Sequence, residues 1–260
     1  MCMAHVISVV NQKGGVGKTT TAINLAAYLA DTGKFVLLLD LDPQANATSG
    51  LGIDYKTVGH GTYEGLIGSR RLRDVVRCTP HEGLKVIPAT PALAGAGVEL
   101  VGASEREHCL RKALLEIRND FDYIIMDHPP SLDLLTINGL TAAESVLIPV
   151  QAEFYALEGL GQLLHTVDLV RDQLNPRLKL LGAVITMFDT RTRLSQEVFE
   201  ELYRYFPEKI FRSVIPRSVR LAEAPSFGKT ILGYDPGSKA AKAYERLTKE
   251  FLMREEERNI

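Results

Sequence analysis

Residues 11–20 read Asn-Gln-Lys-Gly-Gly-Val-Gly-Lys-Thr-Thr, so three glycines, two lysines and two hydroxyl side chains fall in one short segment. Glycines let backbone N–H groups approach an anion closely, because no Cβ stands in the way. Lys18 can then reach terminal phosphates, and the Thr19 hydroxyl can hold Mg²⁺. If the segment were only a glycine-rich turn that caps a helix, the lysine, the hydroxyl and the flanking elements would have to coincide by chance. The segment therefore predicts a phosphate-binding loop.

The elements around the loop favour the same interpretation. Residues 5–10 (HVISVV) form an apolar, β-branched run that is typical of a buried parallel strand. Residues 19–30 (TTTAINLAAYLA) place apolar side chains at helical spacing. A loop between such a strand and helix sets the positive end of the helix dipole beneath the anion. The residues predicted to bind the phosphates are Lys13, Gly14, Gly15, Val16, Gly17, Lys18, Thr19 and Thr20.

The loop departs from the common G-x-x-x-x-G-K-[ST] pattern at its first position. Gln12 stands where that pattern has its first glycine, and Lys13 follows it. Two ammonium groups of one loop repel each other if both face the same phosphates. Lys13 is therefore expected either to serve the nucleotide of a neighbouring subunit or to lie solvated on the surface.

Carboxylates follow two further strand-like runs. Asp40 and Asp42 close the second run, and Asp127 ends the apolar segment YIIMD. If the second strand extended to Asp42, its two aspartates would point to one face, because side chains alternate along a strand. We predict a Mg²⁺ site formed by Thr19 and, through water, by Asp42 and Asp127. Asp42 can also be a helix N-cap ahead of Pro43, and the two roles are compatible.

The pattern of elements predicts an α/β fold. Strands are expected at residues 5–10, 35–40, 84–88, 123–127, 145–150 and 180–187, with helices between them, which gives a doubly wound, mostly parallel sheet covered by helices on both faces. Gln12, Asp40, Asp127 and Asp189 each lie just past a strand and should meet at its carboxyl edge, where such sheets bind ligands. Residues 244–253 (YERLTKEFLM) predict an amphipathic helix that packs on the body.

Composition favours one globular unit. The 260 residues are 45% hydrophobic and 24% charged, and no linker or repeat interrupts them. We expect a single domain over residues 1–260, without an N-terminal helix-turn-helix domain, because the loop begins at residue 11. No apolar run approaches the roughly 18 residues that span a bilayer. There is no signal peptide, and three cysteines without paired spacing favour a cytoplasmic location.

Five segments carry a family resemblance: KGGVGKTT, LLLDLDPQANAT (37–48), YIIMDHPPS (123–131), PVQAEFYALEGL (149–160) and VIPRSVRLAEAPSFGKTI (214–231). Together they resemble the ParA/MinD family of deviant Walker-type ATPases, most closely its ParA (Soj) chromosome and plasmid partition proteins. The resemblance covers nearly the whole chain and implies a deviant P-loop NTPase fold of the SIMIBI type. It also implies ATP and Mg²⁺ as cofactors and an ATPase that is slow without a partner.

The resemblance also assigns roles to single residues. It implies that Asp42, Lys13 and Lys18 are catalytic: Lys13 crosses an ATP-sandwiched homodimer to the partner's phosphates, and Asp42 orients the attacking water. Asp40 lies nearer the magnesium shell and supports the loop. Pro216, Arg217 and Ser218 are implied to border adenine.

Charge is unevenly distributed along the chain. The net charge is −2, yet residues 171–229 hold 11 basic and 7 acidic residues. The resemblance implies that Arg191 and Arg220 bind double-stranded DNA phosphates without sequence preference, and Arg193 and Arg217 are further candidates. The alternative is that these arginines pair with glutamates of the same segment, namely Glu197, Glu200 or Glu201.

These features predict an ATP-dependent dimerising switch that binds DNA non-specifically and segregates a chromosome or plasmid. The resemblance implies that a ParB-type centromere-binding partner stimulates its hydrolysis. A MinD-like membrane ATPase is one alternative, although the tail REEERNI carries three glutamates against two arginines and should not attract anionic lipid. An ATP-dependent synthase of the same superfamily is another. His128 follows Asp127 and is either a pH-sensitive group beside the γ-phosphate or a packed core residue.

Overall fold

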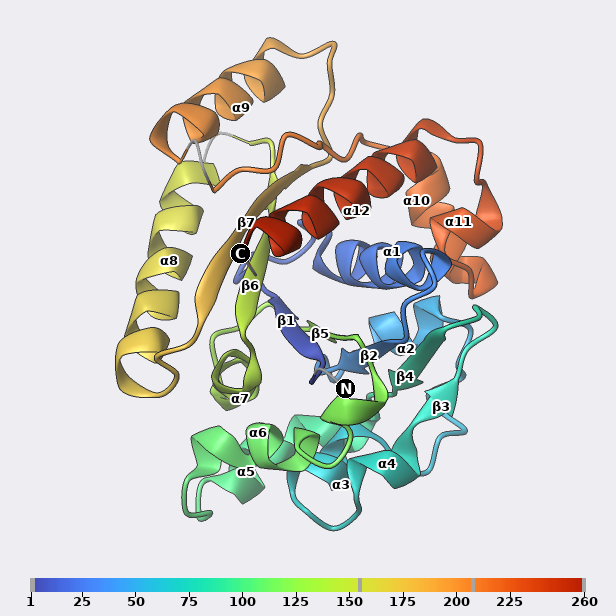
Figure 1. Cartoon of the computed structure of the whole chain (residues 1–260), viewed down its shortest axis with the longest axis vertical. Coiled ribbons are helices and arrows are strands. Elements are labelled where there is room, and N and C mark those ends of the chain that lie inside the picture. The colour runs from blue at the N-terminus through green and yellow to red at the C-terminus, as the bar shows by residue number, and fades with distance from the viewer. Residues whose placement is uncertain (1–2, 154–155, 207–208, 259–260) are drawn as a thin grey trace.

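A computed structural model describes residues 3–153, 156–206 and 209–258, which are built around one seven-stranded sheet (Figure 1). Phe154 and Tyr155 of the fourth family-like segment, and Cys2, lie outside these residues. The strands are β1 (His5–Val9), β2 (Val36–Asp40), β3 (Arg77–Cys78), β4 (Leu84–Ile87), β5 (Tyr123–Asp127), β6 (Ser145–Gln151) and β7 (Lys179–Thr186).

The strand order is β3-β4-β2-β5-β1-β6-β7, and only the β3–β4 pair is antiparallel among the described strands. The predicted doubly wound, mostly parallel α/β fold is confirmed, and all six predicted strands are present within about two residues. Strand β3 was not predicted, because two residues carry no readable alternation.

Helices cover both faces of the sheet. They are α1 (Lys18–Asp31), α2 (Asn46–Gly50), α3 (Thr62–Leu66), α4 (Leu72–Val75), α5 (Ala96–Leu100), α6 (Cys109–Leu114), α7 (Leu134–Ala142), α8 (Ala156–Gln173), α9 (Arg193–Tyr205), α10 (Val219–Glu223), α11 (Ile231–Tyr234) and α12 (Lys239–Arg258), with short 3₁₀ turns at Pro91–Gly95, Arg106–His108, Arg118–Asp120 and Ala224–Phe227. Figure 1 shows α1 and α12 side by side over one face, while α6, α7 and α8 lie over the other. Within the described part of the chain, no helix has both the length and the apolar character that a bilayer span requires.

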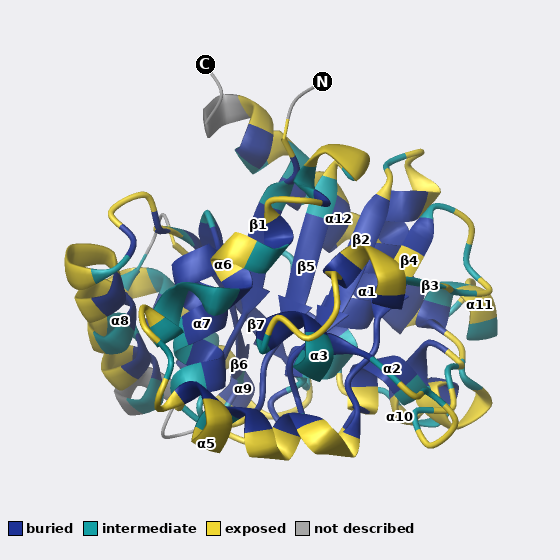
Figure 2. Cartoon of the chain, turned by 90° about the horizontal axis from the view of Figure 1, so that it is seen from below, coloured by how far each residue is buried: buried dark blue, intermediate teal, exposed yellow. Residues whose placement is uncertain are grey.

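Successive side chains along each strand point to opposite faces of the sheet, which gives two separate apolar cores. In β1, Val6 belongs to the core beneath α6–α8, whereas Ile7 and Val9 belong to the core beneath α1 and α12. Figure 2 shows the central strands as almost entirely buried between the two helix layers. The predicted C-terminal helix is confirmed and longer than expected, since α12 begins at Lys239 and buries Tyr244 and Phe251 in this second core.

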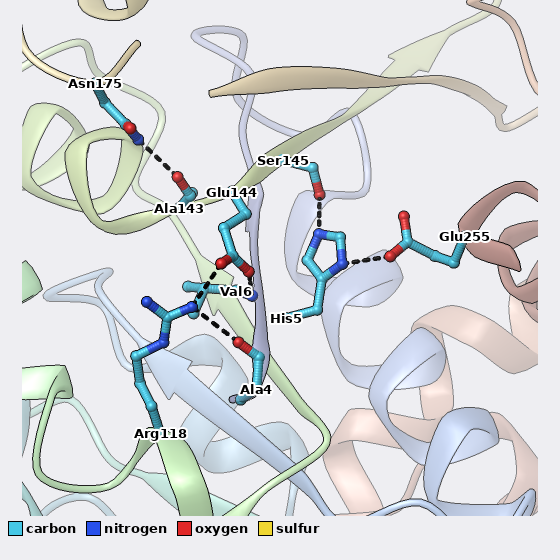
Figure 3. A network of polar contacts seen from close by, with 9 residues as sticks. All are labelled: Ala4, His5, Val6, Arg118, Ala143, Glu144, Ser145, Asn175 and Glu255. Atoms are coloured by element: carbon cyan, nitrogen blue, oxygen red, sulfur yellow. Dashed lines mark hydrogen bonds and ion pairs between the residues drawn. The ribbon is translucent and has the colours of Figure 1, made fainter. Parts of the chain in front are cut away.

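Polar side chains tie the amino ends of the strands together (Figure 3). His5 pairs through Nδ1 with Glu255 of α12, and its Nε2 lies 2.7 Å from the Ser145 hydroxyl oxygen of β6. Arg118 donates a 2.7 Å hydrogen bond to Glu144, which precedes β6. These contacts hold α12, β1 and β6 together at the amino edge of the sheet.

At the opposite, carboxyl edge of the sheet, the connections that leave neighbouring strands run in opposite directions across the sheet. From β1 the chain crosses to β2 on one side, and from β5 it crosses to β6 on the other side of β1. Such a reversal separates the two connections and opens a crevice beyond the end of the central strand. The glycine-rich segment follows β1 directly and therefore lies at this crevice.

Candidate functional site

The glycine-rich loop adopts a backbone that side chains rarely tolerate. Gly15 and Gly17 have φ values of +75° and +88°, in the left-handed region. Gly17 caps α1, whose first residue is Lys18, so the loop ends at the positive end of a 14-residue helix. The Thr186 hydroxyl at the end of β7 donates a 2.7 Å hydrogen bond to the Val16 carbonyl oxygen. The loop is thus a preformed cradle anchored to a second strand.

A cavity of about 600 Å³ opens in front of this loop. Its lining includes the predicted residues Gly14, Gly15, Gly17, Lys18, Thr19, Thr20 and Asp42. It also includes residues that were not predicted from the sequence, among them Asn24, Gln44, Asn46, Ser49, Met187 and Lys229. The size and the concentration of polar groups on one side suit a nucleoside phosphate.

Lys18 extends into the cavity with little contact to solvent. Its side chain is buried, and its Nζ donates a 3.0 Å hydrogen bond to the Lys13 carbonyl oxygen. Burial lowers the pKa of Lys18, while the charges of Asp127 and Asp42 act to raise it. The ammonium is therefore placed to exchange one carbonyl contact for a phosphate oxygen.

Asp127 is the most unusual group of the site. It is fully buried at the end of β5, and neither carboxyl oxygen accepts a hydrogen bond of ordinary geometry from the described residues. Burial raises its pKa well above the usual range, and the Asp40 charge adds to this; the Thr19 hydroxyl and Lys18 act in the opposite direction. A carboxylate beside a threonine hydroxyl is the oxygen set that Mg²⁺ prefers, with water completing its shell. The residues present therefore fit the predicted ion.

The two aspartates after β2 have different surroundings. The strand ends at Asp40, so the alternation that would align it with Asp42 does not apply. Asp40 is fully buried and accepts hydrogen bonds from the Asp42 N–H (3.1 Å), the Thr48 N–H (2.9 Å) and the Thr48 hydroxyl (2.7 Å). Burial raises the pKa of Asp40 to about 6 despite these bonds. Asp42 lines the cavity, and its Oδ1 accepts a 2.9 Å hydrogen bond from the Gln44 N–H.

His128 is a packed core residue. Its side chain is fully buried, its Nε2 lies 3.0 Å from the Ser8 hydroxyl oxygen, and its ring lies where a Cβ on Gly139 of α7 would be. Burial, followed by the Lys18 charge, lowers its pKa to about 3. Of the two interpretations of His128, this burial and packing favour the core residue over the pH-sensitive group.

A second cavity of about 230 Å³ adjoins the first. It is lined by Pro216, Arg217 and Ser218, the three residues expected to border a base. Gly17, Thr20 and Met187 line both cavities, and Tyr244 of α12 contributes an aromatic wall that the sequence did not predict as part of the site. Helical spacing had indicated only that this tyrosine packs inside.

The four candidate DNA-binding arginines do not all line one cleft. Arg191 and Arg217 line one cleft of about 740 Å³ that also holds Lys239, Lys242 and Arg246 of α12, three cations that the sequence analysis did not identify. Arg193 and Arg220 are not among the residues that line this cleft.

Three of these arginines also form ion pairs. Arg191 binds Asp189 through two hydrogen bonds of 2.9 and 2.7 Å, which lower the pKa of Asp189 to about 2. Arg193 pairs with Glu197, as the alternative to DNA binding in the sequence analysis predicted. Arg220 pairs instead with Glu223 and Asp235.

Lys13 does not point into the cavity of its own loop. Its Nζ lies 2.6 Å from an oxygen of Glu153, which follows β6, and both side chains are about half exposed. The two lysines of the loop are thus separated: the Lys18 side chain lines the cavity, and the Lys13 side chain points away from it, toward Glu153.

These features define a P-loop ATPase. The first strand of a mostly parallel sheet leads through a glycine-rich loop into a helix, and a lysine, a hydroxyl and a buried acid lie around one cavity. A family model described as an AAA domain matches residues 4–180. The chain belongs to the ParA/MinD family of these ATPases, and its relatives are Soj/ParA chromosome-partitioning proteins.

Individual relatives match the chain over nearly its full length. It is 54% identical over 248 residues to the sporulation initiation inhibitor protein Soj of Bacillus subtilis, covering 95% of this chain and 98% of that protein. It is 55% identical over 251 residues to the chromosome-partitioning ATPase Soj of Thermus thermophilus, covering 96% of each. Among solved structures, cobyrinic acid a,c-diamide synthase from Mycobacterium smegmatis, with bound ADP and magnesium, superposes with a TM-score of 0.87 at 37% identity, covering 98% of this chain and 96% of that one.

The buried Asp127 leads to a prediction about stability. Its pKa in the folded chain is raised above the ordinary 3.8, so the folded state loses stability as pH rises through that raised pKa. Without Mg²⁺ and nucleotide, Asp127→Asn should raise the melting temperature at about pH 9 by a few degrees, roughly 1 kcal/mol, and by less at about pH 5.

The exposed Asp74, which pairs with Arg71, provides the control, and Asp74→Asn should change little at either pH. Thermal melts followed by circular dichroism measure both variants. An Asp127→Asn melting curve that coincides with wild type at both pH values would show that the buried charge carries no cost.

Proposed function

We propose that this protein is an ATP-driven switch for DNA partition. Mg-ATP closes two subunits face to face, the dimer binds double-stranded DNA without sequence preference, and hydrolysis releases it. The observation that supports this most directly is the position of Lys13, which belongs to the phosphate loop yet directs its ammonium away from its own cavity, to the rim. A lysine so placed can reach the nucleotide of a second subunit.

The nucleotide site follows from the two adjoining cavities. The triphosphate would lie on the backbone from Gly14 to Thr20, with Lys18 on its terminal oxygens, and the base would enter the smaller cavity beside Pro216 and Tyr244. When bound, Mg²⁺ neutralises phosphate charge; Thr19 would hold it directly, and Asp127 and Asp42 would hold it through water.

Hydrolysis in this scheme depends mainly on positioning. Asp42 lines the phosphate cavity and would orient the attacking water, while Lys18 and Lys13 stabilise negative charge as it develops. Phosphoryl transfer in such switches is slow until a charge is supplied across an interface. A low basal rate, stimulated by a ParB-type protein bound near a centromere site, is consistent with this arrangement and with a cytoplasmic, nucleoid-associated switch.

The basic cleft is the proposed DNA surface. Arg191, Arg217, Lys239, Lys242 and Arg246 gather there around a single carboxylate, Asp189. Such a concentration of cations suits duplex phosphates, which are bound through charge rather than base identity. Arg193 and Arg220 would extend the surface on either subunit, although each must first leave an acidic partner.

A second candidate is an ATP-dependent amide-forming synthase. The likeness to a solved structure named as cobyrinic acid a,c-diamide synthase favours it. The higher identity to the two Soj proteins favours partition.

One binding experiment separates the candidates. The chain is mixed with random duplex DNA or with anionic liposomes, in ADP or in a non-hydrolysable ATP analogue, and binding is measured by sedimentation. We expect DNA binding only with the ATP analogue, because the dimer doubles the number of phosphate contacts. Liposome binding would support a MinD-like role instead, and binding to neither would favour the synthase.

Replacing Asp42 separates nucleotide binding from hydrolysis. Asp42→Ala should bind ATP normally, lower kcat by about 10²-fold or more, and keep the ATP-bound dimer on DNA. Phosphate release and DNA retention after ATP addition measure these effects. Wild-type turnover in this variant would remove Asp42 from the mechanism.

Replacing the arginines tests the DNA surface. Arg191→Ala combined with Arg220→Ala should weaken DNA binding by about tenfold or more while dimerisation survives, and each lost phosphate contact should reduce the slope of log K against log salt by about 0.9. Lys242→Ala extends the test to α12. The control is Arg71→Ala, which removes an exposed cation that pairs with Asp74 in α4. Unchanged affinity and slope in the double variant would place the surface elsewhere.

A further inference from the structure

Two side chains at the start of the phosphate loop contact the segment that follows β6, one in the β6–α8 connection and one in α8 itself. The Lys13 ammonium pairs with Glu153, and the Gln12 side-chain amide donates a 2.9 Å hydrogen bond to the Gln162 side-chain oxygen of α8. Glu153 lies two residues past the end of β6, and its own N–H donates to the Gln151 carbonyl oxygen at 2.8 Å. The carboxylate that meets Lys13 is therefore held by a strand end rather than by a free segment.

The backbone of Lys13 is also fixed, so only its side chain can change position. The Lys13 N–H donates to the Asn11 side-chain oxygen at 3.0 Å, and the buried Asn11 amide donates to the Pro149 carbonyl oxygen at 2.7 Å. The Lys13 carbonyl oxygen accepts a hydrogen bond from the Lys18 ammonium. With its backbone held in this way, the Lys13 side chain must leave Glu153 before it can contact another anion.

We infer that Glu153 is a positioning residue that holds Lys13 on its own subunit until the phosphates of a partner's nucleotide compete for it. This inference rests on the proposed function, in which Lys13 acts across a dimer. A triphosphate carries more negative charge than one carboxylate, so it can displace Glu153 once two subunits meet. Without nucleotide, the ion pair keeps the Lys13 ammonium beside Glu153 of the same subunit.

The effect of the pair on dimerisation should be modest. Both side chains are about half exposed, and ion pairs of this kind change an equilibrium by roughly two- to fivefold. Glu153 therefore adjusts the concentration at which the ATP-bound dimer forms. Its removal should make the dimer tighter, because Lys13 no longer has to leave a counter-ion.

The test compares Glu153→Gln with wild type in two measurements. In the first, the nucleotide-free chain is treated briefly with acetic anhydride, and acetylation at Lys13 is followed by mass spectrometry. Lys13 should react about two- to fivefold faster in the variant. In the second, sedimentation with a non-hydrolysable ATP analogue gives the dimer Kd, which should fall by about the same factor.

Two further variants control the result. Glu153→Asp keeps the charge and should stay closer to wild type than Glu153→Gln in both measurements. Glu105→Gln removes the carboxylate of another exposed pair, Lys112–Glu105 at 2.7 Å, and should speed labelling of Lys112 while Lys13 and the dimer Kd stay unchanged.

Either of two outcomes overturns the inference alone: Lys13 labelling that does not respond to Glu153→Gln, or an ATP-dependent dimer that is unchanged or weaker in that variant. A wild-type chain that stays monomeric with the ATP analogue would overturn the proposed function and, with it, the role of Glu153. In that case the labelling result would still report whether the Lys13–Glu153 contact exists.

Discussion

The structure of the site depends on one constraint, which is negative charge buried at the carboxyl edge of the sheet. Asp127 and Asp40 end neighbouring strands and are both fully buried, and after burial itself the Asp40 charge raises the pKa of Asp127. Thr48 and the Asp42 N–H satisfy Asp40, whereas Asp127 has no comparable hydrogen-bond donors among the described residues. An apolar interior disfavours such a charge unless a cation or water shell compensates it, so ligand binding and stability are linked at this position.

The two ends of the sheet divide structural and functional roles. At the amino end, His5, Glu255 and Arg118 join β1, β6 and α12 through closed polar contacts. At the carboxyl end, the Lys18 ammonium donates to the Lys13 carbonyl oxygen, and a cavity opens in front of the loop. Contacts at one edge hold the strands in register, so the backbone that carries the polar groups at the other edge is positioned before a ligand binds. Helix α12 takes part in both, since its Glu255 pairs with His5 at the amino end and its Tyr244 lines the smaller cavity.

Much of this arrangement could be predicted from the sequence. The strands were found because a buried parallel sheet requires continuous apolar runs, and YIIMD is such a run. The loop was found because its glycines and its lysine at 18 are neighbours in sequence. Strand β3 was missed for lack of length, and the sequence left two interpretations of His128 open, because only its packing against Gly139 shows that it is buried.

The chemistry of the loop, the family of the chain and the edge of the sheet at which its acids meet can be read from residue types and local periodicity alone. Which groups face one another depends on how the chain folds. Lys13 meets Glu153 from 140 residues away, and Lys242 and Arg246 join Arg191 in one cleft. The burial of Asp127 likewise follows from how the helices cover the end of β5. Such contacts join segments far apart in the chain, so local sequence patterns carry no signal for them.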